Sequence, residues 1–340
     1  MKRIALAVAI AVALLVAGTI QAQQVTGTVE SHLAAAKKAA GSDFTALYDR
    51  ICSEYEKPLT PPPPAGQGRG GGGGGRQAGP PPAAQWHAEP MKVFDNLYFV
   101  GMTEYSAWAL TTSQGIIVID TIYDYSVEDE VVNGLKKLGL NPADIKYALV
   151  SHAHTDHIGG AKYLQEHFGT RVVMSKEDWD VSDRTIPERI RPKRDVEAKD
   201  GDTLTLGDTT IKMYLTPGHT PGTISSIYQV KDRGTTHTVA TWGGTAFNFA
   251  PKPENFLPYI RSAERYRDVV QKSGADVLLS NHTAYDGTNA KIVALRTRKP
   301  GDRHPYVIGN ATILRYLTTA EECAKAGFLA TTKLAGTSSR

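Results

Sequence analysis

SHAHTDHIGG, residues 151–160, places three histidines and one aspartate within six positions and follows them with two glycines. The residues leading into it, KYALVS (146–151), have the apolar character of a buried strand. The pattern from Gly159 to Phe168 predicts a helix. The polar side chains therefore occupy a loop at the carboxyl end of a strand, where α/β sheets usually carry their functional sites.

The residue types in this loop indicate metal binding. Zinc is held by three or four imidazole, thiolate or carboxylate ligands, and His152, His154, Asp156 and His157 offer four in one turn. His152 and His154 alternate and point the same way along an extended segment, whereas the adjacent Asp156 and His157 diverge. The loop is therefore predicted to serve two metal ions. The alternative, a solvent-exposed polar loop, suits one histidine better than four such residues.

Two later segments offer further ligands. His219 stands in TPGHTPG (216–222), after the strand-like IKMYL, and His282 ends LLSNH (278–282). Either histidine alone could be a capping or surface residue. Their shared position at strand ends favours one common site with the 152–157 loop.

The sequence around these motifs alternates short β-rich runs with helical patterns, which predicts an α/β domain over residues 91–330. Expected strands are NLYFV (96–100), GIIVID (115–120), KYALVS (146–151), RVVMS (171–175), the hairpin TLTLGDTTIKMYL (203–215), ISSIYQV (224–230), HTVATW (237–242) and DVLLS (276–280). Expected helices cover residues 127–138, 159–168, 262–272 and 311–326.

The N-terminal residues 1–22 have the pattern of a secretory signal peptide: a basic start, an apolar run and a small residue, Ala22, at the expected cleavage point. This predicts a periplasmic or secreted protein without stable membrane insertion after cleavage. A membrane anchor is the alternative, but the apolar run from Ile4 to Ala17 is shorter than the roughly 20 residues that span a bilayer.

Other segments lie outside the predicted domain. Residues 23–57 are expected to be a helical segment, 58–90 a flexible insertion rich in proline and glycine, and 331–340 a C-terminal tail. The two cysteines, Cys52 and Cys323, could pair in an oxidising compartment or remain free and buried, and the sequence leaves this open.

Composition excludes some function classes. Hydrophobic residues make up 41% of the chain, enough for a substantial core. The formal net charge is only +3, which gives no electrostatic case for nucleic acid as a partner. No Gly-X-Ser-X-Gly elbow is present, which argues against a serine hydrolase.

Three motifs in order, His-X-His-X-Asp-His (152–157), Pro-Gly-His-Thr-Pro-Gly (217–222) and Asn-His (281–282), resemble those of the metallo-β-lactamase superfamily. The similarity covers about residues 92–290. It implies an α/β fold, a four-layer αββα sandwich, with two Zn²⁺ ions per chain at its edge. By this resemblance the first zinc is held by His152, His154 and His219, and the second by Asp156, His157 and His282.

One departure narrows the resemblance. Many hydrolases of this superfamily, including glyoxalase II, lactonases and nucleases, carry a metal-bridging aspartate on the strand after the Pro-Gly-His motif. Two β-lactamase subclasses carry a cysteine ligand there. Here the stretch reads ATWGGTAFNF (240–249), with Gly243 and Gly244 at the expected position. The chain is most similar to the third β-lactamase subclass, which lacks that ligand.

The resemblance implies an exported zinc hydrolase that opens β-lactam rings by attack of a zinc-held hydroxide on the amide carbonyl, with Asp156 orienting the nucleophile. The alternatives are hydrolysis of another lactone, ester or amide, and a non-catalytic zinc protein. In each enzymatic case the partner is a small-molecule substrate. The oligomeric state is left open.

Substrate contacts are expected near the glycine pair. In the subclass that the chain resembles, serines next to the missing-ligand position help to hold the carboxylate of the β-lactam. By this resemblance, aligning GGTAF with that stretch implies that the Thr245 hydroxyl contacts a substrate carboxylate and that Phe247 replaces a second hydroxyl. Tyr285 and Trp108 are expected as pocket walls, although aromatic residues at such positions are more often core residues.

Overall fold

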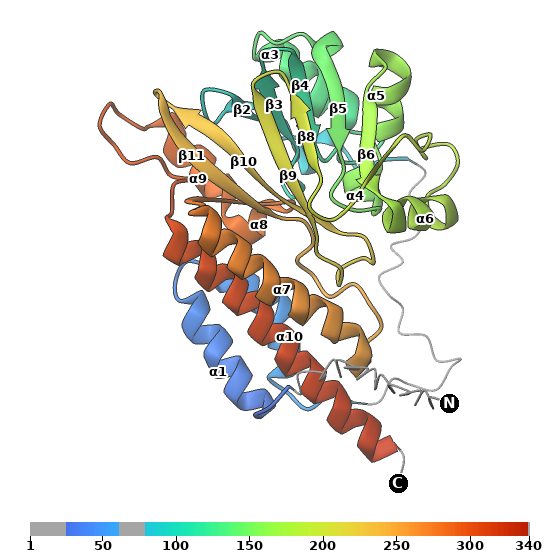
Figure 1. Cartoon of the computed structure of the whole chain (residues 1–340), viewed down its shortest axis with the longest axis vertical. Helices are drawn as coiled ribbons and strands as arrows, with labels where there is room; N and C mark the ends of the chain where they lie inside the picture. The colour runs from blue at the N-terminus through green and yellow to red at the C-terminus, as the bar shows by residue number, and fades with distance from the viewer. Residues whose placement is uncertain (1–24, 61–78, 339–340) are drawn as a thin grey trace, which may run out of the picture.

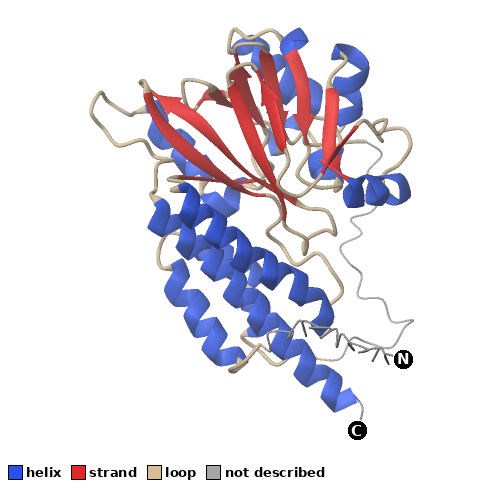
Figure 2. Cartoon of the chain, in the orientation of Figure 1, coloured by secondary structure: helices blue, strands red, loops and turns tan. Residues whose placement is uncertain are grey.

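The computed structural model describes residues 25–60 and 79–338. Two β-sheets pack face to face, and helices cover the outer face of each, giving four layers (Figures 1 and 2). The predicted αββα sandwich is therefore confirmed. The predicted signal peptide lies outside the described residues, as do residues 61–78 of the predicted insertion.

The first sheet has seven strands in the order β1-β2-β3-β4-β5-β6-β7, and the strands from β4 to β7 are parallel. Helices in the crossovers between these parallel strands cover its outer face. The strands are β1 (Met91–Lys92), β2 (Leu97–Phe99), β3 (Trp108–Thr112), β4 (Gly115–Ile119), β5 (Ile145–Leu149), β6 (Arg171–Ser175) and β7 (Val196–Ala198). The helices are a π-helical turn (Glu128–Val132), α3 (Asn133–Lys137), α4 (Thr155–Ile158), α5 (Ala161–Phe168) and α6 (Lys176–Thr185).

The second sheet has five strands in the order β12-β11-β10-β9-β8. All its neighbours are antiparallel except β11 and β12. The strands are β8 (Thr203–Leu206), β9 (Thr209–Leu215), β10 (Ile224–Asp232), β11 (Thr235–Trp242) and β12 (Val277–Ser280). Two short helices follow β12, α8 (Thr283–Asp286) and α9 (Thr288–Arg296).

Strand β4 shows how the sequence fills the layers. Ile116 and Val118 belong to the core under the crossover helices, whereas Ile117 and Ile119 belong to the core between the sheets. Successive side chains of a strand point to opposite faces, so a strand covered on both sides is apolar throughout. This explains the continuous apolar run GIIVI.

The fourth layer joins the two ends of the chain. Helices α1 (Val29–Ala40), α2 (Thr45–Ile51), α7 (Pro253–Ser273) and α10 (Asn310–Ser338) pack over the second sheet (Figure 1). Cys52, just after α2, and Cys323 of α10 form a disulfide. The N-terminal helical segment is thus part of the core of the domain. None of the helices that the structure describes is long and apolar enough to cross a membrane.

Two predicted boundaries are wrong. Helix α10 continues to Ser338, so residues 331–338 are helical and not a separate tail. The insertion predicted to be flexible over 58–90 also regains structure before its end. Trp86 is buried with its ring 5.7 Å from that of Tyr125, and the His87 Nδ1 lies 2.5 Å from the Glu130 carboxylate. Composition could not predict these contacts, because Trp86 and His87 are single residues at the end of a segment rich in proline and glycine.

Candidate metal centre

The structure brings His152, His154 and His219 together as one triplet. The first two lie in the loop after β5, and His219 lies in the loop between β9 and β10. His219 Nε2 is 3.0 Å from His152 Nε2 and 3.1 Å from His154 Nδ1. Three ring nitrogens thus converge on one small volume.

Asp156, His157 and His282 form the second triplet. The Asp156 Oδ2 lies 3.2 Å from His157 Nε2 and 3.5 Å from His282 Nε2. The two triplets are neighbours, because the rings of His152 and His157 are 4.3 Å apart. The side chains of Asp156 and His282 keep 17% and 19% of their surface exposed, so the second triplet is open to a ligand.

Hydrogen bonds at the far side of each ring decide which nitrogens carry lone pairs. His152 Nδ1 lies 2.9 Å from the carbonyl of Gly243, and His219 Nδ1 lies 2.6 Å from that of Ala246. A carbonyl only accepts, so both Nδ1 atoms carry the proton. In the neutral rings the two Nε2 atoms then face each other with lone pairs, which cannot form a hydrogen bond and which a cation would satisfy.

Burial keeps the first triplet in the form that binds metal. It lowers the pKa of His152 well below its usual range and that of His219 to about 3, and the neighbouring imidazoles add to both shifts. Burial also lowers the pKa of His154. Neutral imidazole is the ligand form, so these residues fit a metal site without a proton being removed.

In the second triplet, His157 differs from the histidines of the first triplet because neighbouring carboxylates favour its charged form. Burial disfavours a charge on His157, but the Asp156 and Asp120 carboxylates outweigh it and raise the pKa of His157 to about 10. His157 Nε2 is buried, and although the Asp156 Oδ2 lies 3.2 Å away, this nitrogen forms no well-aligned hydrogen bond with any described residue. A positive charge between the carboxylates is therefore favoured, and a divalent ion would supply it in place of the proton. The residues present fit a divalent ion at each triplet.

Asp120 orients His157, and the sequence analysis missed it. Its Oδ2 lies 3.0 Å from His157 Nδ1 and accepts from Ser151 Oγ at 2.9 Å, while Oδ1 accepts from Ser151 N at 2.7 Å. Asp120 follows β4 with φ 58°, a left-handed conformation that is uncommon outside glycine. The available signal was the acidic residue that ends GIIVID, next to the ligand-bearing strand.

Asp178 of α6 ties the two loops of the first triplet together. Its carboxylate accepts from Ala153 N at 2.9 Å, from Thr220 Oγ1 at 2.8 Å and from Gly222 N at 2.9 Å. Asp178 is fully buried, and these bonds satisfy a charge that burial would otherwise make costly. They set the position of His152 and His154 relative to His219.

The glycines that end the first motif permit close backbone contact. A Cβ on Gly159 would lie 2.8 Å from Asp124 N, and one on Gly160 would lie 2.3 Å from the Thr121 carbonyl. The ligand loop therefore packs directly against the segment after β4, where Thr121 N donates to the His157 carbonyl at 2.8 Å.

Gly243 and Gly244 also permit close packing, here around His219 and β10. A Cβ on Gly244 would lie 2.5 Å from the Cβ of His219, and one on Gly243 would lie 1.8 Å from the Ile224 carbonyl. No side chain fits at either position without displacement. A bridging aspartate is thus absent from the sequence and also excluded by the packing of His219.

Two predicted substrate contacts are wrong. Trp108 is 2% exposed and packs between the sheets against Phe99 and Tyr306. Thr245 is 1% exposed, and its hydroxyl lies 3.1 Å from the Tyr316 hydroxyl in the helical layer.

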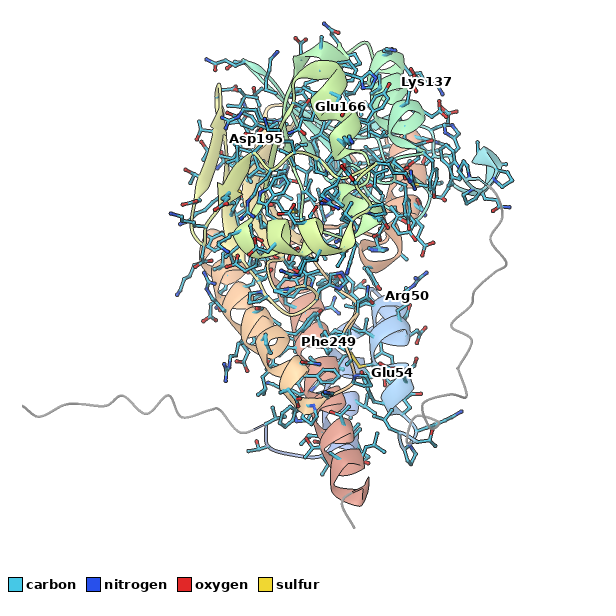
Figure 3. The ribbon with its side chains drawn as sticks, turned by 90° about the vertical axis from the view of Figure 1, so that its right-hand side faces the viewer. Arg50, Glu54, Lys137, Glu166, Asp195 and Phe249 are labelled. Carbon is cyan, nitrogen blue, oxygen red and sulfur yellow. A yellow bond between two sulfur atoms is a disulfide. The ribbon has the colours of Figure 1, made fainter. Side chains whose placement is uncertain are left out.

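Phe247 does not occupy a substrate-binding position either. Its ring lies 4.9 Å from that of Tyr259 and 5.8 Å from that of Phe249, which is labelled in Figure 3. Phe247 is partly buried and packs against the core over the second sheet. The alignment of GGTAF with a carboxylate-recognition site is therefore wrong in this chain.

Tyr285 does lie beside the second triplet, with its ring 5.5 Å from that of His282. The structure adds a neighbour that the sequence analysis missed. The Tyr105 ring lies 5.0 Å from that of His282 and 5.1 Å from that of Tyr123. Tyr105 and Tyr123 are both only half-buried. These rings offer an apolar wall at the open side of the metal centre.

Comparisons with known proteins agree with this geometry. The model of the family described as "Metallo-beta-lactamase superfamily" matches residues 101–233. An N-acyl homoserine lactonase of Bacillus sp is 28% identical over 156 residues, which are 43% of this chain and 59% of that protein. The hydroxyacylglutathione hydrolase GloC of Haemophilus influenzae is 30% identical over 126 residues, 34% of this chain and 58% of that protein. The chain thus spans less than two thirds of these curated relatives.

Solved structures match over a greater length. BJP-1, a subclass B3 metallo-beta-lactamase of Bradyrhizobium japonicum, has a TM-score of 0.59 and 26% identity, covering 74% of this chain and 96% of that one. FEZ-1 from Legionella gormanii has a TM-score of 0.60 and 22% identity, covering 74% and 98%, a likeness of fold. The family match over residues 101–233, the fold and the two ligand triplets together show that the chain contains a domain similar to those of the metallo-β-lactamase superfamily.

Proposed function

We propose that the protein is a dinuclear zinc hydrolase whose substrates are β-lactams. The observation that carries the proposal is the pair of complete triplets with no bridging ligand between them. Gly244, packed against His219, leaves no room for the bridging aspartate that the sequence resemblance associates with lactonases and glyoxalase II. The similarity to a subclass B3 enzyme over 96% of its chain supports the same choice.

The residues divide the chemistry between them. His152, His154 and His219 would hold one zinc, and Asp156, His157 and His282 the other. Zinc at such a site makes water acidic enough to be a nucleophile near neutral pH and polarises a carbonyl. The Asp156 Oδ2 faces the ligand nitrogens, which leaves its other oxygen to accept a hydrogen bond from the attacking water and to take up its proton. Tyr105 and Tyr285 would contact the apolar part of the substrate.

A second candidate is hydrolysis of a lactone. It is favoured by the identity to N-acyl homoserine lactonases and by the loss of the expected carboxylate contact at Thr245. A substrate without a carboxylate would not need that contact.

The test is a panel of a penicillin, a cephalosporin, a carbapenem, an acyl-homoserine lactone and a phosphodiester with the zinc-loaded protein. Carbapenem hydrolysis that disappears in His219→Ala supports the proposal. Hydrolysis of the lactone alone would replace it with the second candidate. Zinc binding without turnover of any of the five would favour a non-catalytic role.

We also propose that the protein is exported. The pattern of residues 1–22 carries this proposal, and the Cys52–Cys323 disulfide is consistent with an oxidising compartment. Mass spectrometry of the protein from the cell envelope is expected to find an N-terminus near Gln23. An intact Met1 on exported protein would contradict cleavage.

A further inference from the structure

A second pocket, distinct from the metal centre, has a volume of about 480 Å³. It lies where α9, the first turn of α10 and the start of α2 meet. Its lining combines an apolar wall, which includes Phe44, Val307 and Ile308, with two cationic side chains, Lys291 and Arg303. The volume lies within the roughly 300 to 1,000 Å³ of small-molecule sites, and the lining has the usual mixture of apolar surface and a few polar groups.

Lys291 is the unusual feature of this pocket. Its Nζ is buried and has no hydrogen-bond partner among the described residues, and the Nζ lies 5.0 Å from the centroid of the Tyr306 ring, over the face of that ring. A buried ammonium without an acceptor is costly, and a cation–π contact replaces only part of the lost hydration. The chain itself therefore leaves this charge incompletely satisfied.

The acidic groups at the pocket have other partners. Asp286 accepts from Ser280 N at 2.8 Å through one oxygen and from Thr288 N at 2.9 Å through the other. It is close enough to influence Lys291 by charge, but the two side chains form no direct ion pair. Asp43 pairs with Arg315, which lies outside the pocket lining.

The remaining polar groups leave the pocket with an excess of positive charge. His304 Nε2 lies 2.8 Å from the Val93 carbonyl, and its Nδ1 accepts from Tyr306 N at 3.2 Å, so the ring is held neutral. Arg303 is exposed and, among the described residues, forms no ion pair. Of the two carboxylates in the lining, that of Asp43 is paired with Arg315, so the two cations face one further carboxylate, that of Asp286.

We propose that this pocket binds a small organic carboxylate, with Lys291 and Arg303 holding the carboxylate and the apolar wall contacting the rest of the molecule. Arginine presents a planar fork that suits a carboxylate, and lysine adds a second charge on a flexible stem. The four rotatable bonds of Lys291 allow its Nζ to turn from the Tyr306 ring toward a ligand in the pocket.

The proposal is tested by calorimetric titration of the zinc-loaded full chain with sodium octanoate. Octanamide serves as the uncharged probe and inorganic phosphate as the probe without an apolar part. Octanoate is expected to bind, and octanamide to bind at least about tenfold more weakly, since it lacks the charge-assisted hydrogen bonds. Phosphate binding as tight as octanoate binding would overturn the role of the apolar wall.

Variants separate this pocket from the metal centre, where a carboxylate could also bind. Arg303→Met and Lys291→Met are each expected to weaken octanoate binding about tenfold or more. Arg296→Met, an exposed arginine on α9 outside the pocket, is the matched control and should leave binding unchanged. Because Arg303 is exposed, its variant keeps the test valid even if Lys291→Met folds poorly.

Two outcomes would overturn the proposal: no octanoate binding to the unaltered protein, or binding that all three variants retain. If Lys291→Met changes only the unfolding temperature, Lys291 has a structural role alone. None of these measurements depends on hydrolase activity, so they stand whether or not the proposed function is correct.

Discussion

Asp120→Asn tests how the second triplet is prepared for metal. The Asp120 Oδ1 accepts a hydrogen bond from Ser151 N. The Asp120 Oδ2 accepts from Ser151 Oγ and from His157 Nδ1. An asparagine must turn its amide NH₂ toward one of these two sides. If the NH₂ faced Ser151 N, two hydrogen-bond donors would point at each other. The NH₂ is therefore expected to face His157.

That orientation changes the tautomer of His157. With an NH₂ beside it, Nδ1 becomes an acceptor, and the proton of the neutral ring moves to Nε2, the atom that faces Asp156 in the second triplet. The lost charge-assisted hydrogen bond is worth about 1.5 to 3 kcal/mol. This corresponds to about a 10- to 100-fold loss of affinity for one metal ion, the usual effect of removing such a partner.

The assay is zinc competition with a chromophoric chelator, fitted to two sites. Asp178→Asn is the matched control, because Asp178 is an equally buried carboxylate whose partners, Ala153 and Thr220, flank the first triplet. Asp120→Asn should weaken only one ion while the other stays tight, whereas any metal loss in Asp178→Asn should fall on the other ion. Equal weakening of both ions in Asp120→Asn, or no weakening, would refute the reasoning.

Three further predictions concern single residues. His282→Ala should reduce bound zinc from about two ions to about one, because only the second triplet loses a ligand; elemental analysis that finds both ions lost would contradict the division into triplets. Gly244→Ala should push His219 aside and weaken the first ion about tenfold or more in the chelator assay, and unchanged zinc affinity would show that the backbone can yield. The Glu130 carboxylate raises the pKa of His87 above its usual 6.5, so the stability from this pair is present below about pH 6.5 and lost as the pH rises through the higher folded-state pKa. His87→Gln should therefore lower the urea midpoint near pH 6 and have little effect near pH 9, and an equal effect at both would exclude this charge linkage.

The sequence predicted which side chains gather into the two triplets, because the spacing of most of these candidate ligands is local. His152 to His157 lie within one turn, and each remaining ligand follows a recognisable strand. The groups that orient them were not predicted, because a bond such as Asp120 to His157 joins segments 37 residues apart and depends on the sheet being formed. Sheet architecture was predictable from alternation of apolar runs with helices, and the main strands fall where those runs lie.

The errors at the substrate side have the same origin. A strand pattern does not tell which face of β3 carries Trp108 toward the second sheet, and nothing near Thr245 shows that its hydroxyl meets Tyr316, 71 residues away. The Cys52–Cys323 pair was also undecidable from sequence, because its geometry arises only when α2 reaches α10. Contacts between distant layers are the part of the structure that local patterns do not determine.

The disulfide also makes most of this chain a covalent ring. Cys52 and Cys323 are 271 residues apart, and all six candidate metal ligands lie between them. A protease that cuts one peptide bond anywhere inside that ring therefore releases no fragment, and the two pieces separate only after reduction. Nicked molecules would migrate as one species without reductant and as two with it. In an oxidising compartment, a single cut would leave both halves of the metal centre bound to the same molecule.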